Sequence, residues 1–289
     1  MRFIGLLLSL LAAWYANAAK LEKRNPTVPT FLFDTIFWVE RGDWKCNKAQ
    51  VTQLSKAIEE ARGLAQSAVT ALSASKAEQS DAYRTWFGQS NASPQKKTTI
   101  INMHFLPAQR NLIPPTSKTT FNKMNEKFTN ARGKGVTKDS LVYACPPPGD
   151  SYCKIPNTLA LIMSQTPGSG WDGPTMMILC PAFFTSKASI DAVAKDWRAS
   201  GSVKTSANPA LTLIHEFQYM TRLTGQSNVC TTVPDPSSKG VDSITGKPKG
   251  CYSPECCMRL SDELKIKNAE NYNMFAGFIR AWPEKAKPS

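Results

Sequence analysis

The sequence predicts an α+β fold in which a small, twisted sheet of mixed strand direction packs on the helix that carries His215, and the second half of the chain is mainly helical. Apolar residues recur at spacings of three and four over residues 48–72, which is typical of a long amphipathic helix. Short apolar and β-branched stretches at 140–145, 158–163 and 175–180 are typical of strands. Helix signals return from residue 208 onwards.

The N-terminal residues predict a secretory leader. Arg2 precedes an apolar run over residues 3–15, and Ala16-Asn17-Ala18 has the small-x-small pattern of signal-peptide cleavage. The pair Lys23-Arg24 is similar to a dibasic processing site. We expect residues 1–18 to be a signal peptide, 19–24 a short propeptide, and 25–289 a single domain of a secreted, extracellular protein. No later apolar run is long enough to span a bilayer, so we expect no membrane insertion.

The first half of the domain mixes helix and strand signals. We expect residues 25–45 to be extended, residues 48–72 to form the long helix, and a short second helix to end at Phe87 before Gly88. Residues 98–106 are β-branched and apolar, which predicts a strand. Between 107 and 136 only residues 121–130 show helical character.

The second half of the domain begins after the strands predicted at 140–145, 158–163 and 175–180. Residues 189–199 predict a short helix. Asn208 is a good N-cap, Pro209 suits the first helical position, and Gly225 is placed to end a helix of about four turns. Residues 226–250 predict a long loop. Residues 253–267 and 268–282 predict two closing helices.

The chain beyond the leader contains eight cysteines: Cys46, Cys145, Cys153, Cys180, Cys230, Cys251, Cys256 and Cys257. An even number in a secreted chain indicates disulfides, and the absence of a CxxC pair argues against a thiolate zinc site. Cys145 and Cys153 enclose a loop short enough for a local bridge. Asn91-Ala92-Ser93 is a glycosylation sequon, followed by Pro94.

The chain is strongly basic, with a net charge of +13. Four basic residues and one acidic residue precede Asn25, so ten of these positive charges remain in the predicted domain. Such a protein adheres to acidic extracellular surfaces such as anionic polysaccharide or acidic proteins. The lysines and arginines do not form a run interleaved with aromatic residues, so we expect no nucleic-acid binding.

The motif richest in chemistry lies on the helix predicted after Asn208. His215-Glu216 begins a His-Glu-Phe-Gln-Tyr sequence. In an HExxH metallopeptidase helix two histidines at i and i+4 bind zinc, and the glutamate activates a metal-bound water. Here position i+4 is Tyr219. The one other histidine, His104, lies far upstream, where we expect it to be a packed residue.

Several segments together resemble the fungal aspzincin, or deuterolysin-like, branch of the zincin metallopeptidases. The resemblance covers most of the predicted domain and rests on these segments: Cys46 with the Ala-rich helix and Tyr83…Trp86-Phe87, Met177–Phe184, Thr212–Glu216, Tyr252-Ser253-Pro254, and Asn268–Ala276. It implies a zincin-like catalytic domain with zinc on His215, Glu216 as general base, and Tyr252 or Tyr219 as hydrogen-bond donor to the oxyanion. It also implies that residues 177–184 form the edge strand beside the cleft, and that Cys180 pairs with Cys256 or Cys257.

The departures from this family fall on the metal ligands. Tyr219 replaces the second histidine, Lys249 stands where the family has its aspartate ligand, and Ser253 replaces a glycine. Asp235 and Asp242 lie in the same loop and are alternative carboxylates, Asp242 being the third ligand that we assign. A Tyr219 phenol must lose its proton to bind metal well, so we expect weak zinc binding or none.

Two functions remain open on the sequence. The first is a secreted zinc metalloendopeptidase-like protein that hydrolyses peptide bonds, with activity weakened or lost through ligand substitution. The second is a pseudoenzyme, a non-catalytic secreted binding or effector protein on a peptidase scaffold. In either case we expect a monomer whose partner is a polypeptide or an acidic extracellular surface.

Overall fold

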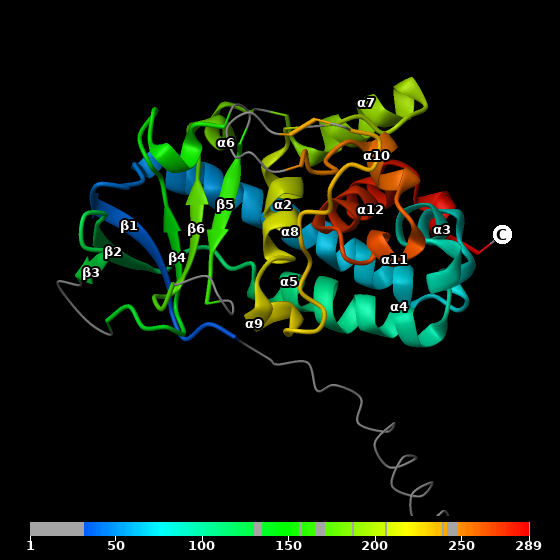
Figure 1. The fold of residues 1–289 in the computed structure, drawn as a ribbon, viewed down its shortest axis with the longest axis horizontal. Helices are drawn as coiled ribbons and strands as arrows, with labels where there is room; N and C mark the ends of the chain where they lie inside the picture. The colour runs from blue at the N-terminus through cyan, green and yellow to red at the C-terminus, as the bar shows by residue number, and fades with distance from the viewer. Residues whose placement is uncertain are drawn as a thin grey trace, which may run out of the picture.

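The computed structural model describes residues 32–129, 135–155, 158–165, 171–186, 188–205, 207–238, 240–241 and 248–288. The predicted leader and propeptide lie outside these ranges, and so does Asp242. Within them the chain has the expected α+β architecture, with the sheet on one side and most helices on the other (Figure 1). No helix in the described ranges is long and apolar enough to cross a bilayer.

The sheet formed by the described residues has the strand order β3-β2-β1-β4-β6-β5. Its strands are β1 (Ile36–Gly42), β2 (Ser117–Asn122), β3 (Lys127–Thr129), β4 (Leu141–Ala144), β5 (Ala160–Met163) and β6 (Thr175–Leu179). The four inner strands are parallel, whereas β3 and β5 at the edges run antiparallel to their neighbours. The mixed sheet is therefore confirmed, and so are the three strands predicted at 140–145, 158–163 and 175–180, which are β4, β5 and β6.

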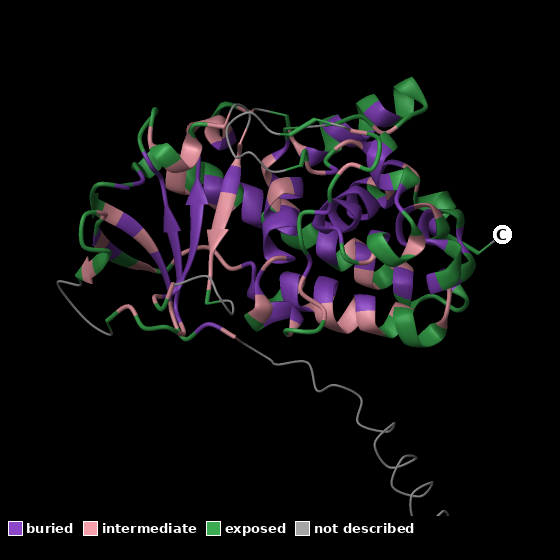
Figure 2. Ribbon diagram, in the orientation of Figure 1, coloured by how far each residue is buried: buried purple, intermediate pink, exposed green. Residues whose placement is uncertain are grey.

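Both faces of the sheet are covered. Val142, Met176 and Ile178 face a smaller apolar cluster that includes Phe37 and Trp44. The alternate residues of the same strands face the main core, which the helices complete. Strands β4 and β6 are consequently buried along their length (Figure 2). Burial on both faces explains why β4 and β6 read as continuous apolar runs in the sequence.

The helices occupy the other side of the molecule. They are α2 (Lys48–Ser73), α3 (Asp81–Phe87), α4 (Pro94–Ile100), α5 (Leu106–Asn111), α6 (Pro181–Thr185), α7 (Ile190–Ser200), α8 (Pro209–Phe217), α9 (Thr221–Thr224), α10 (Pro254–Arg259), α11 (Asp262–Lys265) and α12 (Ala269–Ala281). In α2, Asn47 and Gln50 form a reciprocal capping box. Its buried stripe includes Leu54, Ile58 and Ala61. Helix α2 contacts α8 and α12. The predicted long helix therefore supports α8, the helix that carries His215.

The strand predicted over residues 98–106 is wrong. These residues form the end of α4, a π-helical turn over Ile101–Phe105, and the start of α5. Ser93 caps α4 by accepting a hydrogen bond from the Lys96 N–H, and Pro94 occupies the first turn. The cap and the burial of His104 and Phe105 outweigh the β-propensity of this stretch.

The helix predicted around residues 121–130 is also wrong, because this region forms the β2–β3 hairpin. Thr119 and Phe121 are buried while their neighbours are more exposed, which is the two-residue alternation of a strand. The turn is closed by Asn122, whose side chain accepts from the Met124 N–H. Glu126 there has a φ of 51°.

The helix predicted from Asn208 to Gly225 begins and ends as expected but is interrupted. Regular helix stops at Phe217, and Tyr219 N–H donates to the Glu216 carbonyl in a tighter turn before α9. Tyr219 therefore does not lie on the α8 helix with His215. The predicted helix at 189–199 is confirmed as α7, and the closing region contains α10, α11 and α12, with α10 and α11 separated at Leu260 and Ser261.

The disulfide pairing differs from the expectation. The bridges are Cys46–Cys145, Cys153–Cys180 and Cys251–Cys256, whereas Cys230 and Cys257 are buried thiols. Neither the expected Cys145–Cys153 bridge nor a bridge from Cys180 to the vicinal pair forms. The sheet explains the first correction, since β1 and β4 are neighbours and the segments that follow them meet through the Cys145 N–H and the Trp44 carbonyl.

Candidate functional site

His215 and Glu216 are held on α8 by a well-defined helix start. The Asn208 side chain accepts hydrogen bonds from the backbone N–H groups of Ala210 and Leu211, and Pro209 occupies the first turn. The helix packs against α2 and α12 and contacts β5. His215 and Glu216 are 8% and 7% exposed, so the pair predicted from the motif lies at the inner side of the site.

The nearest charged partner of His215 is Glu270, in the first turn of α12. His215 Nδ1 lies 2.7 Å from Glu270 Oε2, and both side chains are about nine-tenths buried. The distance is that of an ion pair, although Nδ1 finds no acceptor along the direction that a good hydrogen bond needs. We therefore treat the contact as an electrostatic pair with imperfect alignment.

The pKa values of these groups are shifted by burial and by one another. Burial disfavours the His215 cation, but the hydrogen-bonding distance and charge of Glu270, with the charge of Glu216, raise the pKa of His215 above its usual value. Burial raises the pKa of Glu216 to about 7; the His215 charge opposes this shift and the Glu270 charge adds to it. Two carboxyl groups thus share one imidazole, which leaves negative charge uncompensated when both are ionised.

Tyr219 and Tyr252 lie beside His215, joined through Thr232. The Tyr219 hydroxyl is 3.2 Å from Thr232 Oγ1, which is 3.3 Å from the Tyr252 hydroxyl. The rings of Tyr219 and Tyr252 have centroids 5.1 Å and 5.9 Å from that of His215. Burial and the nearby Tyr252 raise the pKa of the Tyr219 phenol well above its usual range, so this hydroxyl keeps its proton.

The remaining ligand candidates are not brought to His215. The Asp235 carboxylate accepts hydrogen bonds from the Ser237 N–H and hydroxyl, which lower its pKa. Lys249 is exposed in the same loop, where its backbone pairs with Gly240 and Asp235. Asp242, the third ligand assigned from the sequence, lies outside the described residues.

The described residues do not fit a zinc ion. They contain no group of three histidine, cysteine or carboxylate side chains that could hold a metal. Catalytic zinc takes three protein ligands. The protonated Tyr219 phenol is committed to Thr232, and His215 Nδ1 faces Glu270. We derive no step through zinc from this arrangement.

Two residues of the site were missed by sequence reasoning. Glu270 pairs with His215 from a helix about 55 positions downstream, and Thr232 joins the two tyrosines. An acidic residue in the first turn of a helix is common, because it stabilises the helix dipole. In the sequence, Glu270 is therefore indistinguishable from an acidic residue that only stabilises the start of a helix. Nothing in the sequence marks Thr232 as a residue of the site.

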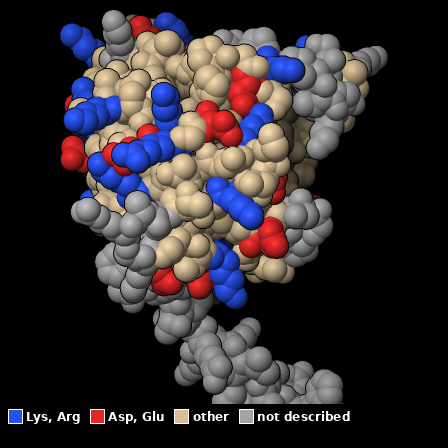
Figure 3. All heavy atoms as spheres, turned by 90° about the vertical axis from the view of Figure 1, so that its left-hand side faces the viewer, with Lys and Arg blue, Asp and Glu red and all other residues tan. Residues whose placement is uncertain are grey.

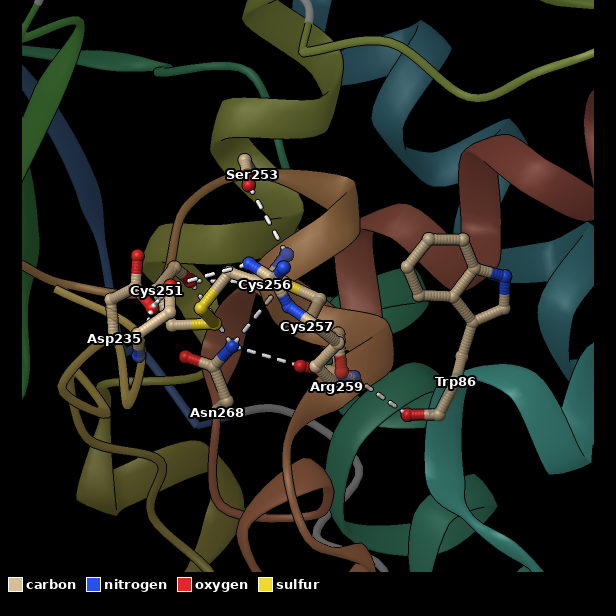
Figure 4. Close-up of a disulfide and its surroundings, with 10 residues drawn as sticks. Trp86, Asp235, Cys251, Ser253, Cys256, Cys257, Arg259 and Asn268 are labelled. Carbon is tan, nitrogen blue, oxygen red and sulfur yellow. Dashed lines mark hydrogen bonds between the residues drawn. A yellow bond between two sulfur atoms is a disulfide. The ribbon is translucent and has the colours of Figure 1, made fainter.

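Tyr252 directly follows Cys251, which is bridged to Cys256. Figure 4 shows this disulfide and its surroundings. Cys251 N–H donates to the Val233 carbonyl, and the Asn268 side-chain amide donates to the Cys251 carbonyl and to Cys257 Sγ. Burial raises the pKa of the Cys257 thiol well above its usual range, which makes it unreactive. The disulfide thus fixes the backbone that leads into Tyr252.

The strand beside α8 is β5, which corrects the expectation that residues 177–184 form the edge. β6 lies inside the sheet between β4 and β5. Cys180 N–H donates to the Leu159 carbonyl, so the alternating ladder directs the backbone groups of Leu161 and Met163 towards β6. Those of Ala160 and Ile162 point to the other side, where no strand pairs with β5 in the described residues.

Asn91 is not suited to carry a glycan in this fold. The side chain is 6% exposed, and its amide donates to the carbonyls of Phe87 and Asp262 at 2.7 and 2.6 Å. A glycan on this nitrogen would displace both hydrogen bonds and the packing around them. The predicted glycosylation site is therefore a structural residue linking α3 to α11.

Comparison with known proteins gives limited similarity. No protein-family model matches the chain, and no curated protein matches it. Among solved structures, a zinc peptidase from Grifola frondosa is similar over 80% of this chain and 96% of its own, with 16% sequence identity and a TM-score of 0.44. Zinc is a property of that peptidase, and the likeness is too distant to extend its activity to this chain.

Proposed function

We propose that this chain is a secreted, non-catalytic protein that binds an extended polypeptide along β5, beside α8, on a scaffold resembling a metallopeptidase. The observation that carries the proposal is the state of Tyr219. At the position of the second zinc ligand it presents a protonated phenol hydrogen-bonded to Thr232, and it lies beyond the end of α8. Position 219 therefore lacks the i, i+4 placement on one helix face that a pair of zinc-binding histidines uses, and the phenol keeps its proton.

Glu216 does not by itself supply the chemistry of peptide hydrolysis. Without a metal to lower the pKa of a water molecule, Glu216 has no strong nucleophile to activate at neutral pH. Its carboxyl group instead completes a buried cluster with His215 and Glu270. We propose that this cluster maintains the shape of the site rather than catalysing hydrolysis.

The open side of β5 supports polypeptide binding. An edge strand offers unpaired N–H and C=O groups to which an extended peptide can add as a further strand. Ile162, which is half-buried, directs its backbone groups to that side, whereas Ala160 is buried and does not offer its groups to a peptide. A purely electrostatic role is less favoured, because lysines and arginines are interspersed with acidic residues on the sheet-side face (Figure 3). Lys118 and Lys123 there pair with Glu40 and Asp150.

The hydrolytic question is tested by the metal content of the purified protein and by cleavage of casein with and without a chelator. We expect neither bound zinc nor chelator-sensitive cleavage. Glu216→Gln is the matched control, since it keeps the side-chain shape but removes the base. Chelator-sensitive cleavage by the wild type that disappears in Glu216→Gln would overturn the proposal.

The binding question is tested with a fluorescent hexapeptide of alternating threonine and valine, blocked at both ends, by fluorescence anisotropy. Ile162→Pro removes one outward N–H, whereas Ile162→Ala removes the side chain but keeps that N–H. We expect affinity to fall about fivefold more in Ile162→Pro than in Ile162→Ala, the effect of one hydrogen bond. Equal affinities of the two variants would exclude strand addition at β5.

A second candidate function is zinc-dependent peptide hydrolysis, which one observation favours. Glu270 at His215 Nδ1 resembles the carboxylate that orients a zinc-bound histidine, and a pKa of about 7 suits Glu216 as a general base. Calorimetry with zinc on Tyr219→His, alone and with Lys249→Asp, tests whether the cleft retains this geometry. Unchanged zinc binding in the double variant would eliminate this candidate.

A further inference from the structure

A cavity of about 250 Å³ lies where β5 leaves the sheet. It is bounded by the residues that follow β5, by Lys138 before β4, by the first residue of β6, and by α9 with its flanking residues. Its polar lining comes from Lys138, Ser164, Gln165, Thr221, Arg222 and Gln226. Thr175 and Met220 are buried in its wall. The volume suits a small functional group or one side chain rather than a drug-sized molecule.

The cavity is continuous with the open side of β5. Ser164 and Gln165 follow Met163 directly, and the Thr221 hydroxyl donates to the Gln165 carbonyl at 3.3 Å. This bond ties α9 to the end of β5. A peptide lying along β5 would therefore bring one of its ends, or a side chain near that end, to the cavity.

The charge of the lining is positive. None of the lining residues is acidic. Arg222 is held in place, because its Nε donates to the Leu32 carbonyl at 2.6 Å and its Nη1 pairs with Asp139 at 2.5 Å. Within the described part of the chain Lys138 makes no ion pair, so its positive charge is not compensated. Lys138 and the neighbouring amide and hydroxyl groups form a donor-rich wall.

We propose that this cavity binds a carboxylate of the partner polypeptide, so that the partner is an acidic segment or a chain end; the inference rests on the proposed function. A carboxylate accepts several hydrogen bonds at once and gains charge-assisted strength from Lys138 and the guanidinium of Arg222. Whether the carboxylate belongs to an acidic side chain or to the C-terminus of the peptide depends on the direction in which the peptide runs along β5. A peptide antiparallel to β5 brings an acidic side chain near its N-terminus to the cavity, whereas a parallel peptide brings its C-terminal carboxylate.

The experiment compares three fluorescent peptides built on the alternating threonine–valine hexamer. The first is blocked at both ends and neutral, the second adds an N-terminal acetylated glutamate to an amidated hexamer, and the third has a free C-terminal carboxylate. We expect one of the two acidic peptides to bind about tenfold tighter than the neutral one, the effect of a partly solvated charge-assisted hydrogen bond. The gain should shrink as salt concentration rises.

Lys138→Gln is the decisive variant, because Lys138 is exposed and its loss leaves no buried group unpaired. We expect it to abolish the tenfold gain and to leave the neutral peptide's affinity unchanged. Lys195→Gln, at an exposed lysine of α7, is the matched control and should keep the gain. Arg222 is not varied, because its bonds to Leu32 and Asp139 hold the local fold.

The outcomes separate this inference from the proposed function. If all three peptides bind equally, or the gain survives Lys138→Gln, the cavity does not recognise a carboxylate although strand addition at β5 stands. If no peptide binds, the proposed function fails and the inference fails with it.

Discussion

The two histidines of the chain have similar burial and opposite chemistry. His104 is 3% exposed and His215 is 8% exposed. Burial lowers the pKa of His104 to about 4, and hydrogen bonding to Gln218 only partly offsets this. The pKa of His215 is raised, because carboxylates surround it. The difference teaches that the neighbours, and not the depth of burial, decide whether a buried imidazole carries charge.

His104 belongs to a neutral hydrogen-bonded network. Its Nδ1 lies 2.8 Å from Gln218 Oε1, and its Nε2 lies 3.1 Å from the Tyr272 hydroxyl. Because the Gln218 amide nitrogen donates to the Ile214 carbonyl, its oxygen can only accept, and Nδ1 must carry the proton. Nε2 is then an acceptor, and the single proton of the Tyr272 hydroxyl is shared between Nε2 and the Ile266 carbonyl, to which the hydroxyl donates at 2.9 Å. This network joins the π-helical turn to α8 and α12 without charge.

The His215 cluster is different because it concentrates charge in a buried place without balancing it. Groups with pKa values shifted by burial and by specific charged neighbours are typical of functional sites. The contrast assigns a structural role to His104 and locates the candidate functional site at His215. Variants of the two clusters test this division.

The largest effect is expected in the neutral network. His104→Ala removes the ring stacked on Tyr272 and leaves the Gln218 oxygen without its donor. We expect the free energy of unfolding at pH 7 to fall by about 3 kcal/mol, from lost packing and unsatisfied buried groups. Urea unfolding measures this change. A decrease of less than about 1 kcal/mol in the free energy of unfolding would show that the network contributes little to the stability of the fold.

The next effect depends on pH and concerns Glu216. Because its folded pKa is about 7 and its usual value is 4.5, the folded state keeps the proton that the unfolded state releases. The contribution of Glu216 to stability is therefore complete below pH 4.5 and is lost as pH rises through 7. Each unit of pKa shift corresponds to about 1.4 kcal/mol.

Glu216→Gln removes this loss, since an amide does not ionise. We expect the variant to gain about 3 kcal/mol relative to the wild type at pH 8, and nothing comparable at pH 4.5. Urea unfolding at both pH values checks the difference. If the variant and the wild type depend on pH identically, Glu216 is not the ionising group that destabilises the fold.

A smaller, spectroscopic effect isolates Glu270. In Glu270→Gln the imidazole loses its charged partner while its burial remains, so we expect the pKa of His215 to fall below the usual value of 6.5. Proton NMR resolves this directly, because the chain has two histidines. The His104 resonance should titrate as in the wild type and serves as an internal control. A His215 pKa that stays raised would mean that Glu270 is not its principal partner.

The smallest effect is expected at Tyr219. Tyr219→Phe removes the hydroxyl that faces Thr232 and leaves the ring against His215. Thr232 is exposed and retains its contact with Tyr252, so we expect stability to change by at most about 1 kcal/mol. Thermal unfolding measures this. A larger loss of stability would indicate that the Tyr219 hydroxyl contributes more to the fold than its contact with Thr232 accounts for.

The sequence predicts the fold well where local signals and tertiary burial agree. The apolar stripe of α2, the runs of β4 and β6, and the cap at Asn208 all gave the right element. The strand predicted at residues 98–106 was wrong because a capped helix start and the burial of His104 and Phe105 outweighed the β-branched composition. The β2–β3 hairpin was not predicted because the pairing of β2 with β1 is a long-range contact, which local periodicity does not report.

The site was predictable only in part, for the same reason. His215, Glu216 and the two tyrosines were identified from a motif and a resemblance, and the structure places the tyrosines beside His215. Glu270 and Thr232 reach the site through tertiary folding, and the two wrong disulfide expectations likewise depended on which strands are neighbours. Asp242 stays a prediction.

The Cys46–Cys145 bridge determines how a cut by a protease in this chain would be detected. The two cysteines are 99 positions apart, and the segment between them contains every element from α2 to β4. A single cut anywhere in that segment leaves both fragments covalently joined. Such a nicked molecule keeps its mass apart from one added water and separates into two fragments only when its disulfides are reduced and the chain is unfolded. The cut is therefore detected on a reducing gel, as two fragments, and is not detected on a non-reducing gel.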